Sequence, residues 1–103
     1  MESNLIMWIQ NWYHSQCDGD WEHECGLKII SIDNPGWDIT VDIVKIDFSK
    51  EIDWRYFETS ENDWFGYKIE DSYFSASGDP TKLEFLLQLF KNFVENGEKV
   101  LPL

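Results

Sequence analysis

Basic residues are scarce in this sequence. Only 8 Lys and Arg accompany 20 Asp and Glu among 103 residues, so the formal net charge at pH 7 is −12. Nucleic-acid phosphates and anionic membrane surfaces both attract basic protein surfaces. The composition therefore argues against nucleic acid and against membranes as partners. A basic protein would complement this charge, although solubility alone also accounts for an acidic surface.

The sequence also lacks an export signal and a membrane span. Its first 13 residues, MESNLIMWIQNWY, contain no Lys or Arg, and Gln10 and Asn11 interrupt the apolar positions. No apolar run approaches the length that a membrane-spanning helix needs. The 2 cysteines, Cys17 and Cys25, are too few for a disulfide framework and are expected to be thiols. We therefore expect a cytoplasmic protein.

Bulky hydrophobic side chains, by contrast, are abundant. Aromatic residues make up 17% of the chain, with 6 Trp and 7 Phe, and hydrophobic residues make up 43%. Disordered chains are poor in aromatic residues, so this composition indicates a folded protein. A chain of this length can bury one core between two layers of secondary structure. Residues 1–103 are therefore expected to form a single domain.

Both ends of the chain have helical patterns. In residues 4–17, apolar side chains recur at spacings of three and four, and Gly19 is the expected left-handed stop. Near the C-terminus, Asp79 is predicted to cap a helix with Pro80 at its first position and Gly97 at its end. The apolar stripe of this second helix consists of Leu83, Leu86, Leu87, Phe90, Phe93 and Val94.

Between these helices the pattern is that of strands. The predicted strands are 26–32, 37–43, 52–58 and 64–70, with a short fifth at 72–77. Consecutive strands with short turns favour an antiparallel meander. The order helix, four or five strands, helix therefore predicts a two-layer α+β domain with both helices on one sheet face.

The second of these strands has the clearest alternation. Its apolar positions alternate with Asp38, Thr40 and Asp42, which predicts a half-buried strand with an acidic outer face. Before it, Pro35 and Gly36 suit a type II turn. After it, the apolar phase changes between residues 43 and 44, which indicates a bulge or a strand break.

The segment QCDGDWEHECG, residues 16–26, has the atoms of a metal site. Cys17, His23 and Cys25 could bind zinc, with Glu22 or Asp20 as a fourth ligand. No C-x-x-C pair and no second cluster accompany them, so no metal is predicted. The spacing also fails the EF-hand template for calcium, which needs glycine at the sixth position and glutamate at the twelfth.

A catalytic thiol is the other chemical alternative. Cys17 follows a predicted helix C-terminus and has carboxylate neighbours, and both features raise a thiol pKa instead of activating it. Paired carboxylates for acid–base catalysis stay possible, but no nucleophile, phosphate-binding or dinucleotide motif accompanies them. A small metal-dependent or thiol enzyme that uses the Cys17–Cys25 loop is therefore the alternative hypothesis, and a protein without catalysis or cofactor is the main one.

The distribution of charge favours a binding surface. Residues 1–27 contain five carboxylates and no Lys or Arg. Trp21 and Trp64 lie outside the apolar stripes, so they are expected to be partly exposed, as interface anchors often are. The predicted partner-binding residues are Asp18, Asp20, Trp21, Glu22, His23, Glu24, Asp38 and Asp42.

The motifs WIQNWY, CDGDWEH and DNPGW resemble the immunity protein 53 family of bacterial polymorphic toxin systems. The segment SASGDPTKLEFLLQLF resembles that family's C-terminal glycine turn and helix, so the resemblance runs from about Trp8 to Phe93. It implies a cytoplasmic antidote that binds and neutralises a cognate toxin, with no catalytic activity and no cofactor. Together with the acidic surface, it leads us to expect a basic toxin such as a nuclease. The family's characteristic positions match Trp12, Asp18, Gly19, Asp20, Trp21, Glu22, His23, Gly26, Asn34, Pro35, Gly36 and Trp37.

Overall fold

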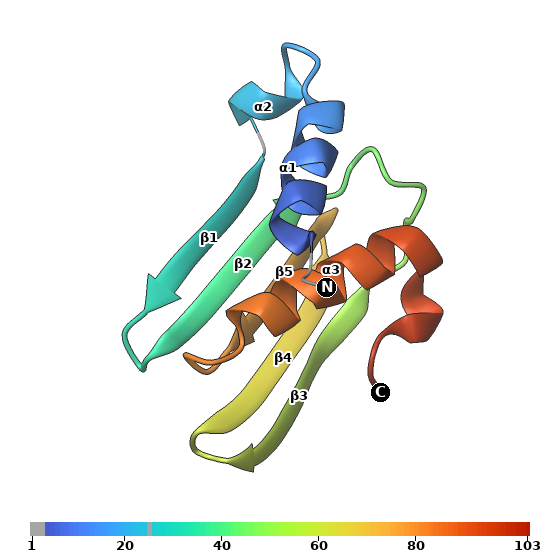
Figure 1. Ribbon diagram of the computed structural model, residues 1–103. Coiled ribbons are helices and arrows are strands. Elements are labelled where there is room, and N and C mark those ends of the chain that lie inside the picture. Colours follow the sequence, from blue (N-terminus) through green and yellow to red (C-terminus); the bar gives the residue numbers. More distant parts are fainter. Residues whose placement is uncertain (1–3, 25) are drawn as a thin grey trace.

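A computed structural model of the protein describes residues 4–24 and 26–103 (Figure 1). Its elements are α1 (Leu5–Gln16), α2 (Trp21–Glu24), β1 (Leu27–Ile32), β2 (Gly36–Asp42), β3 (Ile52–Ser60), β4 (Asp63–Glu70), β5 (Tyr73–Gly78), α3 (Leu83–Asn96) and the short 3₁₀ helix η1 (Glu98–Val100). The N-terminal helix, antiparallel five-stranded sheet and C-terminal helix confirm the predicted α+β class.

The strands lie in the order β1-β2-β5-β4-β3, and every neighbouring pair is antiparallel. This order differs from the predicted meander at one connection, because β2 pairs with β5 and not with β3. Residues 43–51 carry the chain from β2 to the far edge of the sheet. Phe48 in this connection packs edge-on against Phe93 of α3, with ring centroids 5.2 Å apart. The crossing is therefore held by the hydrophobic core.

Both long helices cover the same face of the sheet, as predicted (Figure 1). Phe90 of α3 lies at the centre of the core, with its ring 4.9 Å from Trp12 of α1 and 5.3 Å from Phe74 of β5. Edge-to-face aromatic pairs of this kind add to the free energy that burial of their large area provides. Within residues 4–24 and 26–103, no helix has the length and apolarity needed to cross a membrane.

The C-terminal helix begins later than predicted. Asp79 does not cap it, because α3 starts at Leu83. The carboxylate of Asp79 is instead fully buried and accepts hydrogen bonds from the backbone N–H of Trp64 and from Lys82 Nζ. Residues 79–82 form a separate turn, closed by a 3.0 Å hydrogen bond from Lys82 N–H to the Asp79 carbonyl. Gly97 ends the helix as predicted.

The segments around β2 also refine the sequence predictions. Gly36 is the first residue of β2 and pairs with Ile32, so it is not the third residue of a type II turn. A Cβ at this position would collide with the Gly78 carbonyl oxygen of β5, which explains the glycine. At its other end β2 stops at Asp42, which confirms the predicted strand break.

Candidate interaction surface

The acidic loop between α1 and β1 uses two of its carboxylates to hold its own backbone. Asp18 accepts hydrogen bonds from the backbone N–H groups of Asp20 and Trp21, at 2.9 and 3.0 Å. Glu22 accepts from the N–H groups of Asp18 and Gly19, at 3.0 and 2.8 Å. The two bonds to Asp18 satisfy N–H groups at the start of α2, and the two bonds to Glu22 hold the backbone that precedes it. The predicted loop therefore contains a short helix, α2, and Asp18 and Glu22 stabilise it.

A lysine from the β2–β3 connection neutralises part of this loop. Lys45 Nζ lies 2.8 Å from the Asp18 carboxylate and donates to the Gln16 carbonyl at 2.7 Å. The hydrogen bond from Lys45, followed by those from the Trp21 and Asp20 N–H groups, holds the pKa of Asp18 well below its usual range. Asp18 is therefore a charged structural residue with its oxygens already engaged.

Trp21 lies in the core. Only 4% of it is exposed, and its ring lies 6.0 Å from Trp12 and 5.6 Å from Tyr13. The expectation of a partly exposed anchor at this position is wrong, because α2 turns the indole toward α1. Besides Asp18, whose carboxylate is already engaged, the loop leaves three side chains exposed, those of Asp20, His23 and Glu24. Among the described residues, no hydrogen bond or ion pair engages these three side chains.

The alternative hypothesis of metal or thiol chemistry finds no support in the described part of the chain. The Cys17 thiol donates to the Tyr13 carbonyl oxygen at 3.3 Å. Within residues 4–24 and 26–103, no group of three His, Cys, Asp or Glu side chains could hold a metal ion. Cys25, the remaining zinc-ligand candidate considered from the sequence, lies outside the described residues.

The two carboxylates of β2, those of Asp38 and Asp42, are less exposed than the predicted acidic outer face requires. Asp42 is only 5% exposed, and its carboxylate accepts the backbone N–H of Val44 at 2.8 Å. Asp38 is half-buried and accepts from the hydroxyl groups of Ser77 and Thr40, at 2.6 and 3.3 Å. Both carboxylates are thus engaged within the protein, and the expectation that Asp42 is exposed is wrong.

The sheet face opposite the helices carries a cluster of aromatic rings. Side chains alternate between the faces of a strand. Tyr67 is fully buried beneath the helices and pairs in register with Arg55, so the neighbours of Arg55, Trp54 and Tyr56, lie on the opposite, open face. Trp64 of β4 shares this face and is half-buried, which confirms the predicted partial exposure.

These rings line a hollow of about 470 Å³, here called the aromatic hollow. Its lining residues are Ile32, Asn34, Trp54, Tyr56, Glu58, Glu61, Trp64 and Ser77. The Trp54 and Tyr56 rings are 6.5 Å apart at 24°, and the Tyr56 and Trp64 rings are 6.1 Å apart at 36°. The carboxyl groups of Glu58 and Glu61 are its charged lining groups.

A second hollow of about 400 Å³ occupies the other end of the open face. Its lining combines Glu24 and Glu70 with Lys28 and Lys68, so both signs of charge meet there. Lys68 already pairs with Glu70 at 2.8 Å. The two ends of the open face therefore differ in character, one of mixed charge and one aromatic and acidic.

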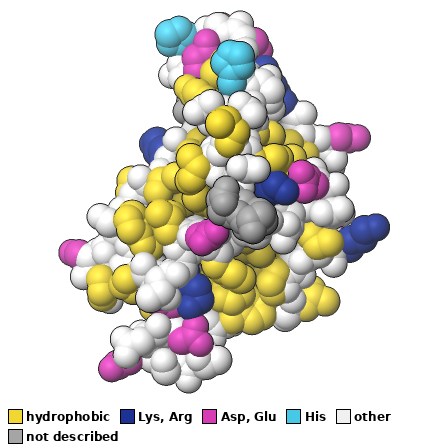
Figure 2. Space-filling view, in the orientation of Figure 1, with side chains coloured by type: hydrophobic (Ala, Val, Ile, Leu, Met, Phe, Trp, Pro, Cys, Tyr) yellow, Lys and Arg dark blue, Asp and Glu magenta, His cyan; other side chains and the backbone are white. Residues whose placement is uncertain are grey.

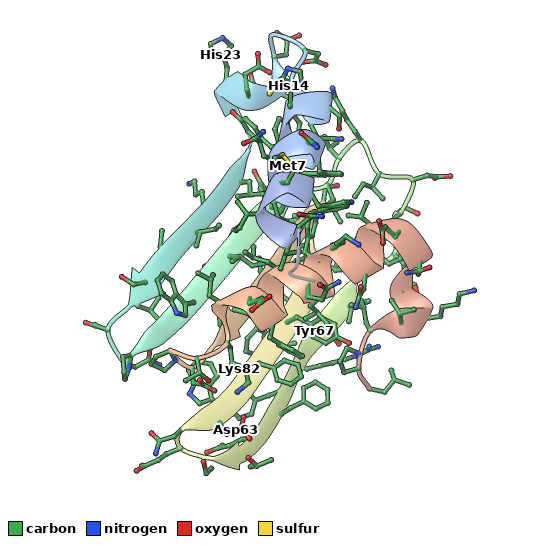
Figure 3. All side chains as sticks on the ribbon, in the orientation of Figure 1. Met7, His14, His23, Asp63, Tyr67 and Lys82 are labelled. Carbon is green, nitrogen blue, oxygen red and sulfur yellow. The ribbon has the colours of Figure 1, made fainter. Side chains whose placement is uncertain are left out.

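The acidic loop and the aromatic hollow lie at opposite ends of the molecule. Figure 3 places His14 and His23 at the α2 end, and Asp63, which precedes Trp64, at the other end. Figure 2 shows the helix-covered side, where charged side chains are scattered among apolar ones. One feature of the sequence indicated the hollow. Trp54, Tyr56 and Glu58 occupy every second position of β3, so they are expected on one face of the strand. That feature was hidden because Phe57, on the buried face of β3, follows Trp54 and Tyr56 in the sequence, so the aromatic residues do not mark one face.

A family model described as immunity protein 53 matches residues 6–95 of the chain. The matched range includes the acidic loop, all five strands and nearly all of α3. Neither the curated proteins nor the solved structures contain a match to this sequence.

Proposed function

Since the chain belongs to the immunity protein 53 family, we propose that it binds a cognate toxin domain and blocks its active site or substrate groove. In this proposal it is a stoichiometric inhibitor in the cytoplasm and performs no chemistry of its own. The further proposal that the toxin is basic rests on the net charge of −12 on a folded chain of 103 residues. A charge of this sign favours a basic toxin, because opposite charges accelerate and orient association.

The ion pairs of the fold strengthen the electrostatic argument. The lysines that pair with a carboxylate are Lys45, Lys50, Lys68, Lys82 and Lys91. The guanidinium of Arg55 donates to the Tyr67 hydroxyl at 2.6 Å, on the helix side of the sheet. Most of the few cations are thus occupied, and most acidic groups remain to define the surface potential. A nuclease toxin fits this surface, since a groove that binds phosphates is itself basic.

Within the acidic loop, Asp20, His23 and Glu24 are proposed to contact the toxin. Their side chains are exposed, while Asp18, Trp21 and Glu22 hold the loop in shape. A loop held by its own hydrogen bonds loses little conformational entropy on binding, which favours affinity. Asp38 and Asp42 are not included in the proposed contact, because protein groups already engage their carboxylates.

The first test uses a candidate toxin domain, sought among the genes that neighbour the gene of this protein. Co-expression of the intact chain with this toxin domain is expected to restore cell growth. Calorimetry of the two purified proteins is expected to show a one-to-one complex. Growth arrest in the presence of folded protein, together with no detectable heat of binding, would contradict the proposed function.

The second test reverses the charge of the loop without unfolding it. Asp20→Lys combined with Glu24→Lys is expected to slow association with the toxin, most strongly at low salt. Glu22→Lys is unsuitable, since Glu22 accepts two backbone N–H groups. The matched control is Asp47→Lys with Glu84→Lys, which changes the net charge equally at exposed positions elsewhere. Equal slowing by both pairs would assign the effect to overall charge and exclude the loop as a contact.

A further inference from the structure

We propose that the aromatic hollow receives an arginine side chain of the toxin. The inference rests on the proposed function, since it assigns the arginine to the toxin, and it adds a second contact region on the open sheet face. The guanidinium would lie against the rings of Trp54 and Tyr56 and pair with the carboxylates of Glu58 and Glu61.

The exposure of the rings is the first observation. Trp54 is 47% exposed and Tyr56 is 50% exposed, although both lie on a sheet with a well-formed core on its other face. Trp and Tyr are the side chains most often found as anchors of protein interfaces, because they bury a large area and lose little conformational freedom. Side by side in one hollow, they form a platform that water covers only at a cost in free energy.

The platform is held rigidly from below. Gly66 lies beneath the Trp54 ring, and a Cβ there would come within 2.7 Å of the ring atom Cη2. The backbone N–H of Trp64 is fixed by the buried Asp79 carboxylate, and the Tyr56 hydroxyl donates to Glu58 at 3.2 Å. The Tyr56 ring also contacts the rings of Trp54 and Trp64, so the three rings support one another before any partner arrives, which lowers the entropic cost of binding.

The charge of the hollow selects the chemistry of its occupant. Among the described residues, its lining includes Glu58 and Glu61 and no Lys or Arg. Lys82, at the same end of the molecule (Figure 3), is already bonded to Asp63 and Asp79 at 2.6 and 2.7 Å. The hollow therefore offers π faces and unopposed carboxylates together, a combination that favours a cation.

Arginine fits this combination better than lysine. Its guanidinium is planar, so it can stack on an aromatic ring while its edge donates to a carboxylate. Lysine carries a compact and strongly hydrated charge that gains less from a flat platform. The mixed-charge hollow at the other end of the open face does not offer this match, because Lys28 and Lys68 line it.

The decisive experiment measures the dissociation constant of the complex with the toxin domain that the first test identifies. Trp54→Ala and Tyr56→Ala are each expected to weaken binding by about tenfold or more. Glu58→Gln with Glu61→Gln is expected to weaken binding and to reduce its dependence on salt. The control is Ile6→Ala, which truncates an exposed hydrophobic side chain on α1, at 69% exposure, and should stay within about twofold. Folding of each variant is checked by its urea midpoint.

If the wild-type chain binds the toxin and both aromatic substitutions leave the dissociation constant unchanged, the inference is overturned and the proposed function stands. Absence of any wild-type complex would instead count against the proposed function. The hollow can then be judged by a probe that needs no toxin. Titration with N-acetylarginine amide is expected to shift the indole N–H signals of Trp54 and Trp64 in a saturable way in ¹⁵N NMR spectra.

The matched probe is N-acetylcitrulline amide, which has nearly the same shape and no charge. It should leave both indole signals unchanged, and equal shifts with the two probes would overturn the assignment of a cation. Sedimentation velocity of the wild type and of Trp54→Ala addresses a different occupant. A dimer that only the wild type forms would mean that a second copy of the chain covers the hollow, and would also overturn the inference.

Discussion

The buried carboxylate of Asp79 accepts a hydrogen bond from the backbone N–H of Trp64, 15 residues earlier in the chain, at 2.9 Å. The same carboxylate accepts from the N–H and hydroxyl groups of Thr81 and from Lys82 Nζ, at 2.8, 2.6 and 2.7 Å. It therefore joins the turn before α3 to the start of β4. Through Trp64, this joint also supports one wall of the aromatic hollow.

Removing the charge of Asp79 should destabilise the fold strongly. Asp79→Asn replaces one acceptor oxygen by an NH₂ group that faces donors, and it leaves Lys82 without its buried partner. Breaking a buried hydrogen-bonded ion pair costs about 3–5 kcal/mol. We expect a loss of this order in the free energy of unfolding, measured by urea denaturation. Asp53→Asn, at an exposed position, should change it by less than about 0.5 kcal/mol.

Stability should also fall in acid because of this carboxyl group. Burial raises the pKa of Asp79, but the hydrogen bonds from Lys82, Thr81 and Trp64 outweigh burial and hold the pKa well below its usual range. Because the unfolded pKa is about 3.9, the contribution is complete at neutral pH and is lost as the pH falls below about 4. Urea denaturation between pH 2.5 and 7 should show this decline, and Asp79→Asn should show a shallower one. Parallel curves for the two proteins would exclude Asp79 as the cause.

Gly66→Ala should deform the aromatic hollow without removing any of its side chains. The new methyl group would lie 2.9 Å from the Arg55 carbonyl oxygen and would collide with the Trp54 ring, so both backbone and ring must move. We expect a destabilisation of about 1–3 kcal/mol. The indole N–H signal of Trp54 should move to a new position in NMR spectra. Ser75→Ala, on the same open face, is the control and should leave that signal in place.

Trp21→Ala should act on stability and not selectively on binding. The substitution removes a buried indole from its contacts with Trp12 and Tyr13, and such truncations cost about 3–5 kcal/mol. The exposed neighbour His23 provides the comparison, because His23→Ala should change stability by less than about 0.5 kcal/mol. A Trp21→Ala protein with wild-type stability and lost toxin binding would contradict the placement of this indole in the core.

Ser72→Gly should stabilise the protein. Asp71 and Ser72 join β4 to β5 and have φ angles of 55° and 67°, in the region where side chains other than glycine are strained. Relief of this strain should raise the free energy of unfolding by about 1 kcal/mol. Asn62→Gly in the β3–β4 turn is the matched control, because the φ of Asn62 is not positive and glycine there gains nothing. A gain of equal size in both variants would refute the strain argument.

The sequence predicted the parts of this fold that local spacing determines. The apolar positions of both long helices and the buried positions Ile39 and Val41 of β2 are of this kind, and they agree with the structure, whereas Asp42 does not follow the alternation. The sequence did not predict the pairing of β2 with β5, because strand order depends on contacts between distant segments. Asp79 had the local pattern of a helix cap, yet a donor 15 residues away, on Trp64, decided its role.

The candidate site, too, could be predicted from the sequence only in part. Sequence identified the acidic loop, but it could not separate the carboxylates that bind the loop backbone from those that face solvent. Asp18 and Glu22 belong to the first group, whereas Asp20 and Glu24 belong to the second. The sequence also could not show which aromatic residues are exposed. Trp21 is buried and Trp54 is exposed because of the side chains that pack over each ring.

The separation of the acidic loop from the aromatic hollow has a kinetic consequence. Long-range charge governs how fast two proteins meet, whereas a desolvated anchor governs how long they stay together. In the proposed complex, Asp20 and Glu24 at one end should therefore set the rate of capture, and Trp54 and Tyr56 at the other should set the residence time. Because distant sites contribute independently, the chain could change the speed of its response to a toxin without shortening the life of the complex.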